Sequence, residues 1–447
     1  MSTVLGKSCL AELGGALRRH PRAIAGIQWA MTALYLALLV LPALPPLLID
    51  RNINIPHTHL EWLVRFAFWG LWWPLLIISI LLVGRAWCGL LCPEGLLTEA
   101  ASRFGLGRGA PAWMKWGGWP FVAFAVTAIS GELLDVHGSA RTTVLLFGAS
   151  TVLAVIVGFI YGRGKRVWCR YLCPINGLFI VLARLSPVYF RVNQEAWVNA
   201  PRGTRSSLHN PVNCAPLIDI RRMTGASQCH MCGRCSDHRG AVTLAARSPN
   251  REVLSLTERE ISRWDIALLA YGLLGLSVGA FQWMVSPWYV VLRNHVGAWA
   301  GRVATVWALQ APGGGALQLV SLLVYISGTA VILGSWILLW LHLAQRLIKR
   351  PGSSMRLVYA LTPLAGASML LGSGVLTLNV LALPLTDLRW IGIVRDGLLA
   401  GGVIWSCALA AHMIKDWGDV PRWRRRLGCT AVLAAASIVA FSWVMMI

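Results

Sequence analysis

The chain has 447 residues, of which 56% are hydrophobic and only 13% charged, and its mean hydropathy is +0.62. This balance excludes an ordinary soluble globular protein. The formal net charge of +22 raises the question of nucleic-acid binding. The basic residues, however, gather in loops between apolar runs, so the charge records membrane topology and we expect no nucleic-acid partner.

Nine apolar runs are long enough to cross about 30 Å of hydrocarbon as helices. They cover roughly 24–49, 66–83, 112–130, 143–161, 265–291, 317–345, 356–381, 391–414 and 427–446. The first run is too long for a signal peptide and lacks a small-residue cleavage site. We therefore expect an all-α polytopic membrane protein with about nine transmembrane helices.

Arginine and lysine are distributed unevenly among the loops. Basic clusters precede the first run and follow the second, fourth, sixth and eighth, whereas loops 50–65, 131–142 and 381–390 are poor in them. The positive-inside rule then places the N-terminus in the cytoplasm. We expect a multi-pass protein of a bacterial inner membrane, with membrane lipid as one partner.

Two similar cysteine motifs follow inward-running spans. "GRAWCGLLCPEGLL" covers 84–97, and "GRGKRVWCRYLCPINGLF" covers 162–179. Buried cysteines can simply be small hydrophobic residues, but the repeated Trp-Cys-x-x-x-Cys-Pro context argues against that. We predict one shared redox site between the repeats, either an iron–sulfur cluster or a reversible dithiol pair. Its residues are Cys88, Cys92, Cys169 and Cys173.

Proline after each second cysteine predicts a helix that ends there and a new one that begins. Cys92 and Cys173 would then lie at helix N-termini, where the dipole lowers the pKa of a thiol. We expect nearby arginines to offset the negative charge of several thiolates. These are Arg85, Arg166 and Arg170.

A long polar segment, 186–264, interrupts the membrane pattern on the cytoplasmic side. Cys229, Cys232 and Cys235 have the Cys-x-x-Cys-x-x-Cys spacing of ferredoxin-type clusters, and Cys214 is the local candidate for a fourth ligand. A structural zinc site is the alternative, although zinc favours two separated Cys-x-x-Cys pairs. We predict a [4Fe–4S] cluster there. The chain then has three parts: membrane region 1–185, a ferredoxin-like insert 186–264, and C-terminal membrane helices 265–447.

With these motifs the sequence resembles the membrane-bound polyferredoxins of NapH, NosR and FixG type, from about residue 70 to residue 251. Compared with the two-cluster ferredoxins of that family, all four ligand positions of one cluster hold other residues. Those positions are Thr204, Ser207, Asn210 and Arg239. We therefore expect that one cluster keeps all four of its ligands and that the other cluster is absent.

The resemblance implies an electron-transfer component rather than a stand-alone enzyme. It would relay electrons between a quinone pool or cytoplasmic donor and a respiratory or maturation partner protein. A copper- or cofactor-assembly factor that uses the Cys-x-x-x-Cys-Pro thiols is the main alternative, since thiolates also suit Cu(I). A transporter regulated by the cluster is a third.

Other polar residues support weaker interpretations. His342 and His412 could serve a b-type haem, but an interfacial histidine with a water or carbonyl partner explains each more simply, and we do not expect haem b. Arg395 and Asp396 are adjacent near the outer end of a span. Three cysteines lack any motif and are expected to be packing or surface residues: Cys9, Cys407 and Cys429.

The predicted topology can be tested with reporter fusions. Fusions at His137 and at His209 should report opposite sides of the membrane, because one lies in an Arg-poor loop and the other in the polar insert. If both report the same side, the two cysteine motifs are not a parallel repeat.

Overall fold

The computed structural model describes residues 2–41, 57–199, 212–306, 314–350, 352–381, 389–418 and 420–446. The chain forms two compact units. Unit 1 comprises Met1–Val64, Leu75–Ala123 and Thr143–Ser255, and unit 2 comprises Arg65–Pro74, Phe124–Thr142 and Leu256–Ile447. Each unit is described separately below.

Within the described ranges, eight helices are long and apolar enough to span a membrane. They are Pro21–Val40, Leu60–Val83, Ala140–Ile160, Arg263–Gln282, Gly315–Ile348, Ser353–Val380, Trp390–Asp416 and Arg422–Met445. The ninth expected span, 112–130, is represented only by a shorter apolar helix. Gly117 and Gly118 interrupt it, and helix α7 (Trp119–Leu133) has only 15 residues, about 22 Å at 1.5 Å per residue. The structure therefore supports eight of the nine expected spans.

Unit 1 is built mainly from helices of the first half of the chain. They are α1 (Ser2–Arg19), α2 (Pro21–Val40), α4 (His57–Arg65), α5 (Trp73–Val83), η3 (Trp87–Leu91), α6 (Pro93–Phe104), η4 (Ala112–Lys115), α8 (Ala140–Ile160), α9 (Val167–Tyr171), α10 (Asn176–Leu182) and η5 (Ala183–Leu185). The chain bends at His20, and Pro21 begins α2 with a φ angle already suited to a helix. Helix α2 packs against both η3 and α6, which carry the first cysteine motif.

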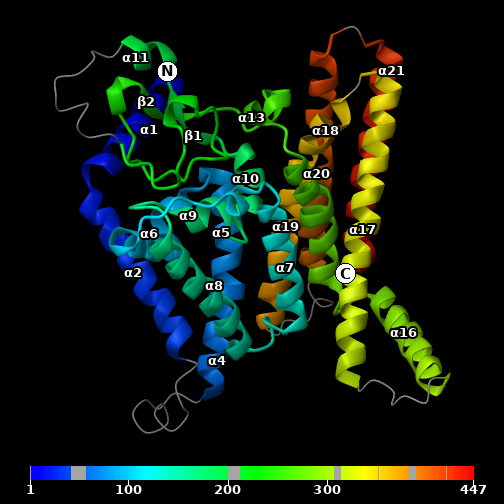
Figure 1. Cartoon of the computed structure of the whole chain (residues 1–447). Helices are drawn as coiled ribbons and strands as arrows, with labels where there is room; N and C mark the ends of the chain where they lie inside the picture. The colour runs from blue at the N-terminus through cyan, green and yellow to red at the C-terminus, as the bar shows by residue number, and fades with distance from the viewer. Residues whose placement is uncertain are drawn as a thin grey trace. The chain divides into compact units, whose positions relative to one another are not determined.

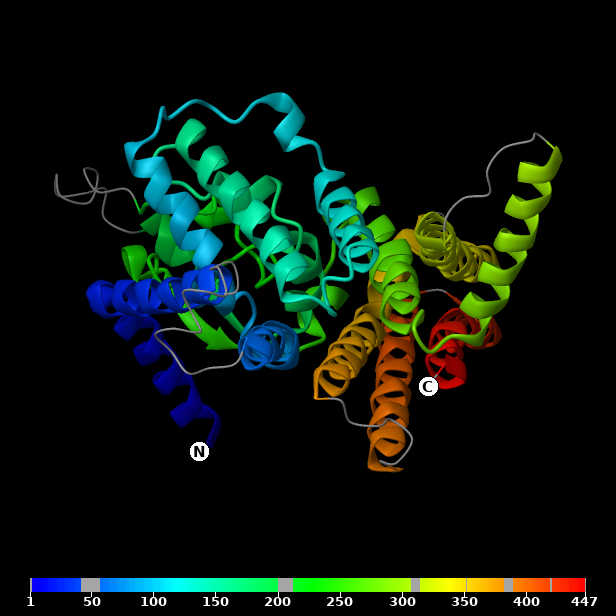
Figure 2. The same cartoon turned by 90° about the horizontal axis from the view of Figure 1, so that it is seen from below.

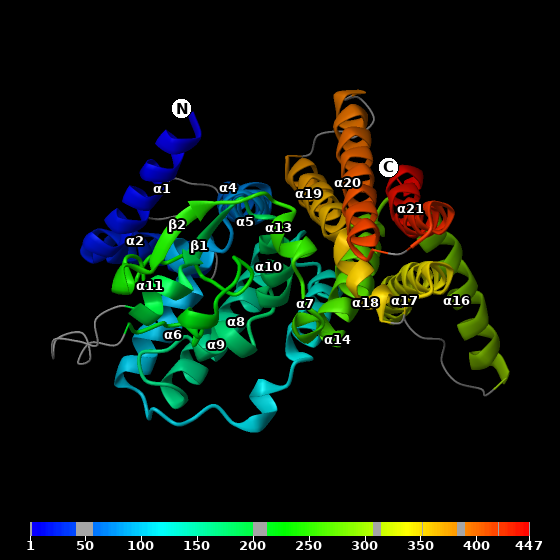
Figure 3. The same ribbon diagram turned by 90° about the horizontal axis from the view of Figure 1, so that it is seen from above.

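The polar insert contributes a two-stranded sheet to unit 1. Its elements are β1 (Val188–Val192), α11 (Gln194–Asn199), η6 (Ile220–Arg222), η7 (His238–Gly240), β2 (Val242–Ala246) and α13 (Arg251–Leu254). The strands pair antiparallel, from Val188 opposite Ala246 to Val192 opposite Val242. Helix α1 lies against β2 (Figures 1 and 3), and Gly14 permits this approach because a Cβ there would lie 2.9 Å from Leu244 Cβ.

A buried ion pair organises the insert, and its Arg247 also donates through Nη2 to the carbonyls of Ala183 and Arg184, just before the insert. Arg247 Nη1 lies 2.6 Å from Glu252 Oε2, and Arg247 Nε donates to the carbonyl of Ser186. Glu252 also accepts hydrogen bonds from the backbone N–H groups of Ala226 and Ser227, at 2.8 and 3.3 Å. Because a buried carboxylate needs several partners, these contacts hold the loop that leads to Cys229.

Unit 2 contains most of the C-terminal helices. They are η2 (Phe66–Trp72), α14 (Arg263–Ala267), η8 (Glu258–Glu260), η9 (Leu268–Leu276), α15 (Ser277–Gln282), α16 (Pro287–Val306), α17 (Gly314–Ile348), α18 (Ser353–Val358), η10 (Tyr359–Leu361), α19 (Thr362–Val380), α20 (Arg389–Asp416) and α21 (Arg422–Met446), together with α7 in large part. Helix α17 packs on α21, α21 on α20, and α20 on α19; Figure 2 shows this bundle from below.

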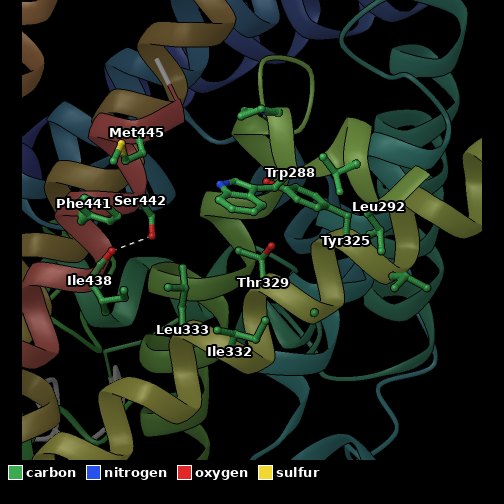
Figure 4. A pocket seen from close by; sticks show the side chains of 14 residues that line it. Trp288, Leu292, Tyr325, Thr329, Ile332, Leu333, Ile438, Phe441, Ser442 and Met445 are labelled. Atoms are coloured by element: carbon green, nitrogen blue, oxygen red, sulfur yellow. Dashed lines mark hydrogen bonds between the residues drawn. The ribbon is translucent and has the colours of Figure 1, made fainter. Parts of the chain in front are cut away.

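An apolar groove of about 990 Å³ lies between α16, α17 and α21 of unit 2 (Figure 4). Every side chain in its lining is apolar, aromatic or hydroxyl-bearing, including Trp288, Tyr325 and Phe441. Ser442 satisfies its hydroxyl on its own helix by donating to the carbonyl of Ile438 at 2.7 Å. The groove holds none of the motif cysteines, all of which belong to unit 1.

Candidate functional site

The first cysteine motif changes direction at Cys92. Residues Trp87–Leu91 form a wide helical turn, Cys92 is extended (φ −67°, ψ 117°), and Pro93 is the first residue of α6. The expected helix break at this proline is therefore confirmed. Cys88 is buried, and the backbone of Gly95 in the first turn of α6 hydrogen-bonds the Cys92 sulfur.

The second motif follows a different path. Cys169 is buried on α9, and the Asn176 N–H closes a turn on the carbonyl of Cys173 at 3.1 Å. Helix α10 consequently begins two residues after Pro174, so the prediction that this proline starts the new helix is wrong. Asn176 also joins the two motifs, because its Oδ1 accepts from Arg85 Nη2 at 2.6 Å.

The four motif cysteines come together in unit 1. Burial raises the pKa of the Cys92 thiol well above its usual range, and Cys169 and Cys88 raise it further. Burial likewise raises the pKa of Cys173, followed by Cys169 and then Glu94, Cys92 and Cys88. Such mutual effects mean that each thiol lies within range of its neighbours' charge. At Cys92 burial outweighs the N-terminus of α6, which corrects the expected dipole effect, and Cys173 does not lie at the N-terminus of α10.

The four cysteines of the insert form a second group. Burial raises the pKa of Cys229, and Cys235, Cys232 and Cys214 add to the increase. For Cys235, burial together with Cys232 and Cys214 raises the pKa to about 12. The thiols of each predicted set therefore influence one another electrostatically within unit 1, although they come from segments that are separate in the sequence.

The backbone between Cys229 and Cys235 is shaped for sulfur ligands. Met231 and Gly233 have φ angles of +54° and +73°, so the loop curls and turns N–H groups inward. The Met231 N–H donates to Cys229 Sγ at 3.3 Å. Hydrogen bonds of this kind stabilise cluster sulfurs and set their potential. Four thiols around such a loop fit an iron–sulfur cluster.

The side chains themselves are not arranged as a finished metal site. Within the residues that the structure describes, no three His, Cys, Asp or Glu side chains converge closely enough to hold an ion, and all of the cysteines there are free of disulfides. What fits a cluster is the donor chemistry: two sets of four sulfurs, which suit iron–sulfur clusters and, less specifically, Cu(I) or zinc.

The two cysteine groups touch through their backbones at Gly89. A Cβ at Gly89 would lie 2.0 Å from the carbonyl oxygen of His230 and 2.9 Å from the backbone nitrogen of Cys232. Only glycine permits this approach of the first motif to the insert loop. Gln28 Nε2 donates to the Gly89 carbonyl at 2.6 Å, so α2 fixes the same contact from the other side.

Arg166 lies between the two cysteine groups. Its side chain is 2% exposed, its Nη1 donates to the carbonyl of Cys88 at 2.6 Å, and its Nε donates to Glu99 Oε2 at 2.8 Å. Burial lowers the pKa of Arg166, but Glu99 and, after it, Cys169 and Cys232 raise it above its usual value. One buried guanidinium is thus coupled to a cysteine from each group.

Glu99 is the acidic partner of three arginines. Besides Arg166, Arg234 Nη2 lies 2.9 Å and Arg103 Nη2 3.2 Å from its Oε1. Burial alone would raise the pKa of Glu99, but Arg166 and Arg234 together lower it below its usual value. The carboxylate therefore stays ionised and ties α6, α9 and the insert loop together.

Arg85 and His230 complete the polar surroundings. Arg85 donates to the carbonyl of Ser227 at 3.1 Å, and its charge lowers the pKa of Cys88, which burial raises. His230 is 2% exposed, and its pKa is lowered well below the usual value by burial and by Arg85, Arg166 and Arg170. The expected role of Arg85 and Arg166 in offsetting thiolate charge agrees with these contacts.

Sequence reasoning missed several residues of this site. Glu94 is one: burial raises the pKa of its carboxyl, and Trp168 Nε1 donates to its Oε2 at 3.1 Å. Glu94 and Glu99 are the acidic residues in the Arg-rich stretch 84–110, which was an available signal. The contacts of Gly89, His230 and Arg234 join segments that are distant in the sequence, so no local sequence pattern predicts them.

The weaker candidates have local partners. His342 Nε2 accepts from Arg346 at 3.1 Å, and His412 Nδ1 lies 2.7 Å from the carbonyl of Ala408, one turn earlier. Arg395 and Asp396 pair with each other at 2.8 Å. Thr204, Ser207 and Asn210 lie outside the described residues. Cys9 is exposed, whereas Cys407 and Cys429 are partly buried.

Comparison with known proteins agrees with this chemistry. The model of a family described as "4Fe-4S binding domain" matches residues 66–111 and 144–192, the two segments that contain the Cys-x-x-x-Cys-Pro motifs. The chain is 23% identical over 228 residues to the putative electron transport protein YccM of Escherichia coli K12. That match covers 45% of this chain and 62% of the relative. No solved structure matches the chain.

These findings define a class. Two segments of the chain match a 4Fe-4S binding domain, and eight helices among the described residues fit a multi-pass membrane protein, so the chain is similar to iron–sulfur proteins of electron transport.

Glu99→Gln tests the packing of this site. Removing the charge leaves Arg166 buried without its carboxylate, which should destabilise unit 1 by about 3 kcal/mol or more. The pKa of Glu99 is lowered, so its contribution is fully present above the usual carboxyl pKa and is lost only as the pH falls through the lowered value. Thermal unfolding in detergent should show the same deficit from about pH 6 to about pH 8. A deficit that vanishes toward pH 6 would contradict the assignment, and Glu195→Gln, on the exposed helix α11, is the control.

Proposed function

We propose that this protein is a membrane-integral electron carrier with two iron–sulfur sites in direct contact. The observation that carries the proposal is the approach at Gly89, which brings the insert loop against the first cysteine motif. Electron transfer depends steeply on distance, and adjoining backbones make the two sites neighbours. Bound clusters would supply the one-electron chemistry at both places.

Cys88, Cys92, Cys169 and Cys173 would hold one cluster. The family match over 66–111 and 144–192 supports this choice over a dithiol pair, because its two segments contain these four residues. The helix start at Cys92 supplies a backbone hydrogen bond to sulfur, and Arg85 and Arg166 offset negative charge. Because the thiols are buried and their pKa values raised, metal binding is what would ionise them.

Cys214, Cys229, Cys232 and Cys235 would hold a [4Fe–4S] cluster in the insert. Arg239, the position at which a second ferredoxin-type run would end, has a φ of +57° and stacks on the Trp197 ring at 5.3 Å. A residue with this separate structural role supports a single cluster in the insert. The remaining positions of the lost cluster rest on the sequence alone.

Electrons would pass between a quinone pool or cytoplasmic donor and a partner protein of respiration or cofactor maturation. The chain spans 62% of the length of the curated relative it matches, so this whole-protein role rests on the resemblance and on the site. We further propose that 1–185 and 265–447 are membrane regions in a bacterial inner membrane, with the insert 186–264 and the N-terminus in the cytoplasm. The alternating basic loops support that orientation.

Iron content in cysteine variants tests the two-cluster proposal. Cys88→Ser and Cys169→Ser should each remove one cluster's iron, because both contribute to one shared site. Cys229→Ser should remove the other cluster and its low-temperature EPR signal. Cys407→Ser and Cys429→Ser, which change cysteines of unit 2, are matched controls and should keep full iron and sulfide.

The outcomes separate the alternatives. Stoichiometric copper in the wild-type protein, lost in Cys88→Ser, would favour the assembly-factor role. If Cys88→Ser and Cys169→Ser both keep the iron content and electron-transfer rate of the wild-type protein, these cysteines have only a packing role. Two distinct centres that both disappear in variants of the insert would overturn the single-cluster assignment.

A further inference from the structure

A pocket beside Cys232 has a lining that is chemically complementary to an anionic amphiphile. It is a pocket of about 400 Å³ in unit 1, between α2, α6 and the insert loop. Its lining combines three arginines, Arg18, Arg103 and Arg234, with apolar side chains that include Ile24, Trp29 and Leu96. The site depends on the membrane-spanning role of α2 and not on any cluster.

The lining residues come from three helices and the insert loop. Arg18 lies at the end of α1, before the bend at His20, and Ile24 and Trp29 lie on α2. On α6, Leu96 and Ala100 line the pocket one turn apart, and Arg103 lies in the last turn. The lining is therefore amphipathic, and Arg18 directly precedes a helix that fits a membrane span.

The arginines have donors left after their internal contacts. Arg103 and Arg234 share the two oxygens of Glu99 with Arg166, and Arg18 Nη1 lies 3.8 Å from Asp237 Oδ2. Four guanidiniums thus face two carboxylates, an excess of two positive charges. The side chains of Arg18 and Arg103 are 48% and 61% exposed, and each guanidinium has five N–H donors.

We propose that this pocket binds the headgroup of an anionic phospholipid. Phosphate is the group that two or three guanidiniums bind best, by paired hydrogen bonds. The apolar face of α2 would accept the glycerol and the first carbons of an acyl chain, which a free phosphate ion would leave uncovered. In the proposed topology the three arginines lie at the cytoplasmic leaflet, where anionic lipids attract basic clusters.

The bound lipid would act on the neighbouring redox site. Cys232 and Gly89 line the same pocket, so the lipid would cover this side of the insert loop. Covering excludes water, and a phosphate adds negative charge. Both effects disfavour a further electron, so the reduction potential of the insert cluster should become more negative in anionic membranes.

Lipid retention measured by native mass spectrometry tests the site without depending on iron. The full chain is purified from nanodiscs that contain phosphatidylcholine with phosphatidylglycerol. Arg18→Gln/Arg103→Gln should bind phosphatidylglycerol about tenfold less than the wild-type chain. Ala100→Phe should have the same effect by filling the pocket while every arginine remains. Arg22→Gln/Arg108→Gln, at exposed arginines outside the lining, is the matched control and should bind normally.

Three outcomes would overturn the proposal. Equal loss in the control pair would mean general charge attraction, and unchanged retention in both test variants would mean no site; each overturns it. Competition by inorganic phosphate as effective as that by phosphatidylglycerol would assign the arginines to free phosphate and overturn the lipid. Loss of lipid retention in the test variants, with their iron content unchanged, supports the site. A wild-type chain that retains the lipid but contains no iron would contradict only the proposed electron carrier.

Discussion

The arrangement of the site depends on one close backbone contact, at Gly89. Any side chain there would meet the carbonyl of His230, and the insert loop would have to move away from the first motif. The buried ion pair of Arg166 with Glu99 holds the same contact together, since Arg166 also donates to the Cys88 carbonyl and Arg234 brings the insert loop to Glu99. The missing side chain at Gly89 and the ion pair of Arg166 with Glu99 therefore stabilise the same contact between the first motif and the insert loop.

Electrostatics explain why cysteines, arginines and so few acids gather there. Burial opposes ionisation of the thiols, and each neighbouring thiol opposes it further. Thiolates persist in such surroundings only when a metal and nearby cations neutralise them. Arg85 and Arg166 supply part of that charge from within the protein, and Glu99 pairs with Arg166 and limits the excess of positive charge. The same set of charges would adjust the potential of a bound cluster.

Sequence patterns predicted the parts of this protein better than their assembly. Pro93 marked a helix start because this signal is local, whereas the two groups of four cysteines that the spacing indicated stay predictions. The predicted helix start at Pro174 is wrong, because a turn closed by Asn176 precedes α10. The predicted length of the span 112–130 is wrong, because average hydropathy is insensitive to the turn at Gly117 and Gly118. The contacts of Gly89, Glu99 and Arg234 join segments far apart in the chain. Hydropathy and spacing carry no information about such contacts.

We propose that two iron–sulfur sites adjoin each other across Gly89. EPR of the fully reduced, full-length protein is the sharpest test, because two paramagnetic clusters in contact must interact magnetically. We expect a broadened, fast-relaxing spectrum from coupled centres, which becomes a simple isolated signal in Cys88→Ser. A wild-type spectrum that is the plain sum of two non-interacting centres, or that contains one centre and is unchanged in Cys88→Ser, would contradict it.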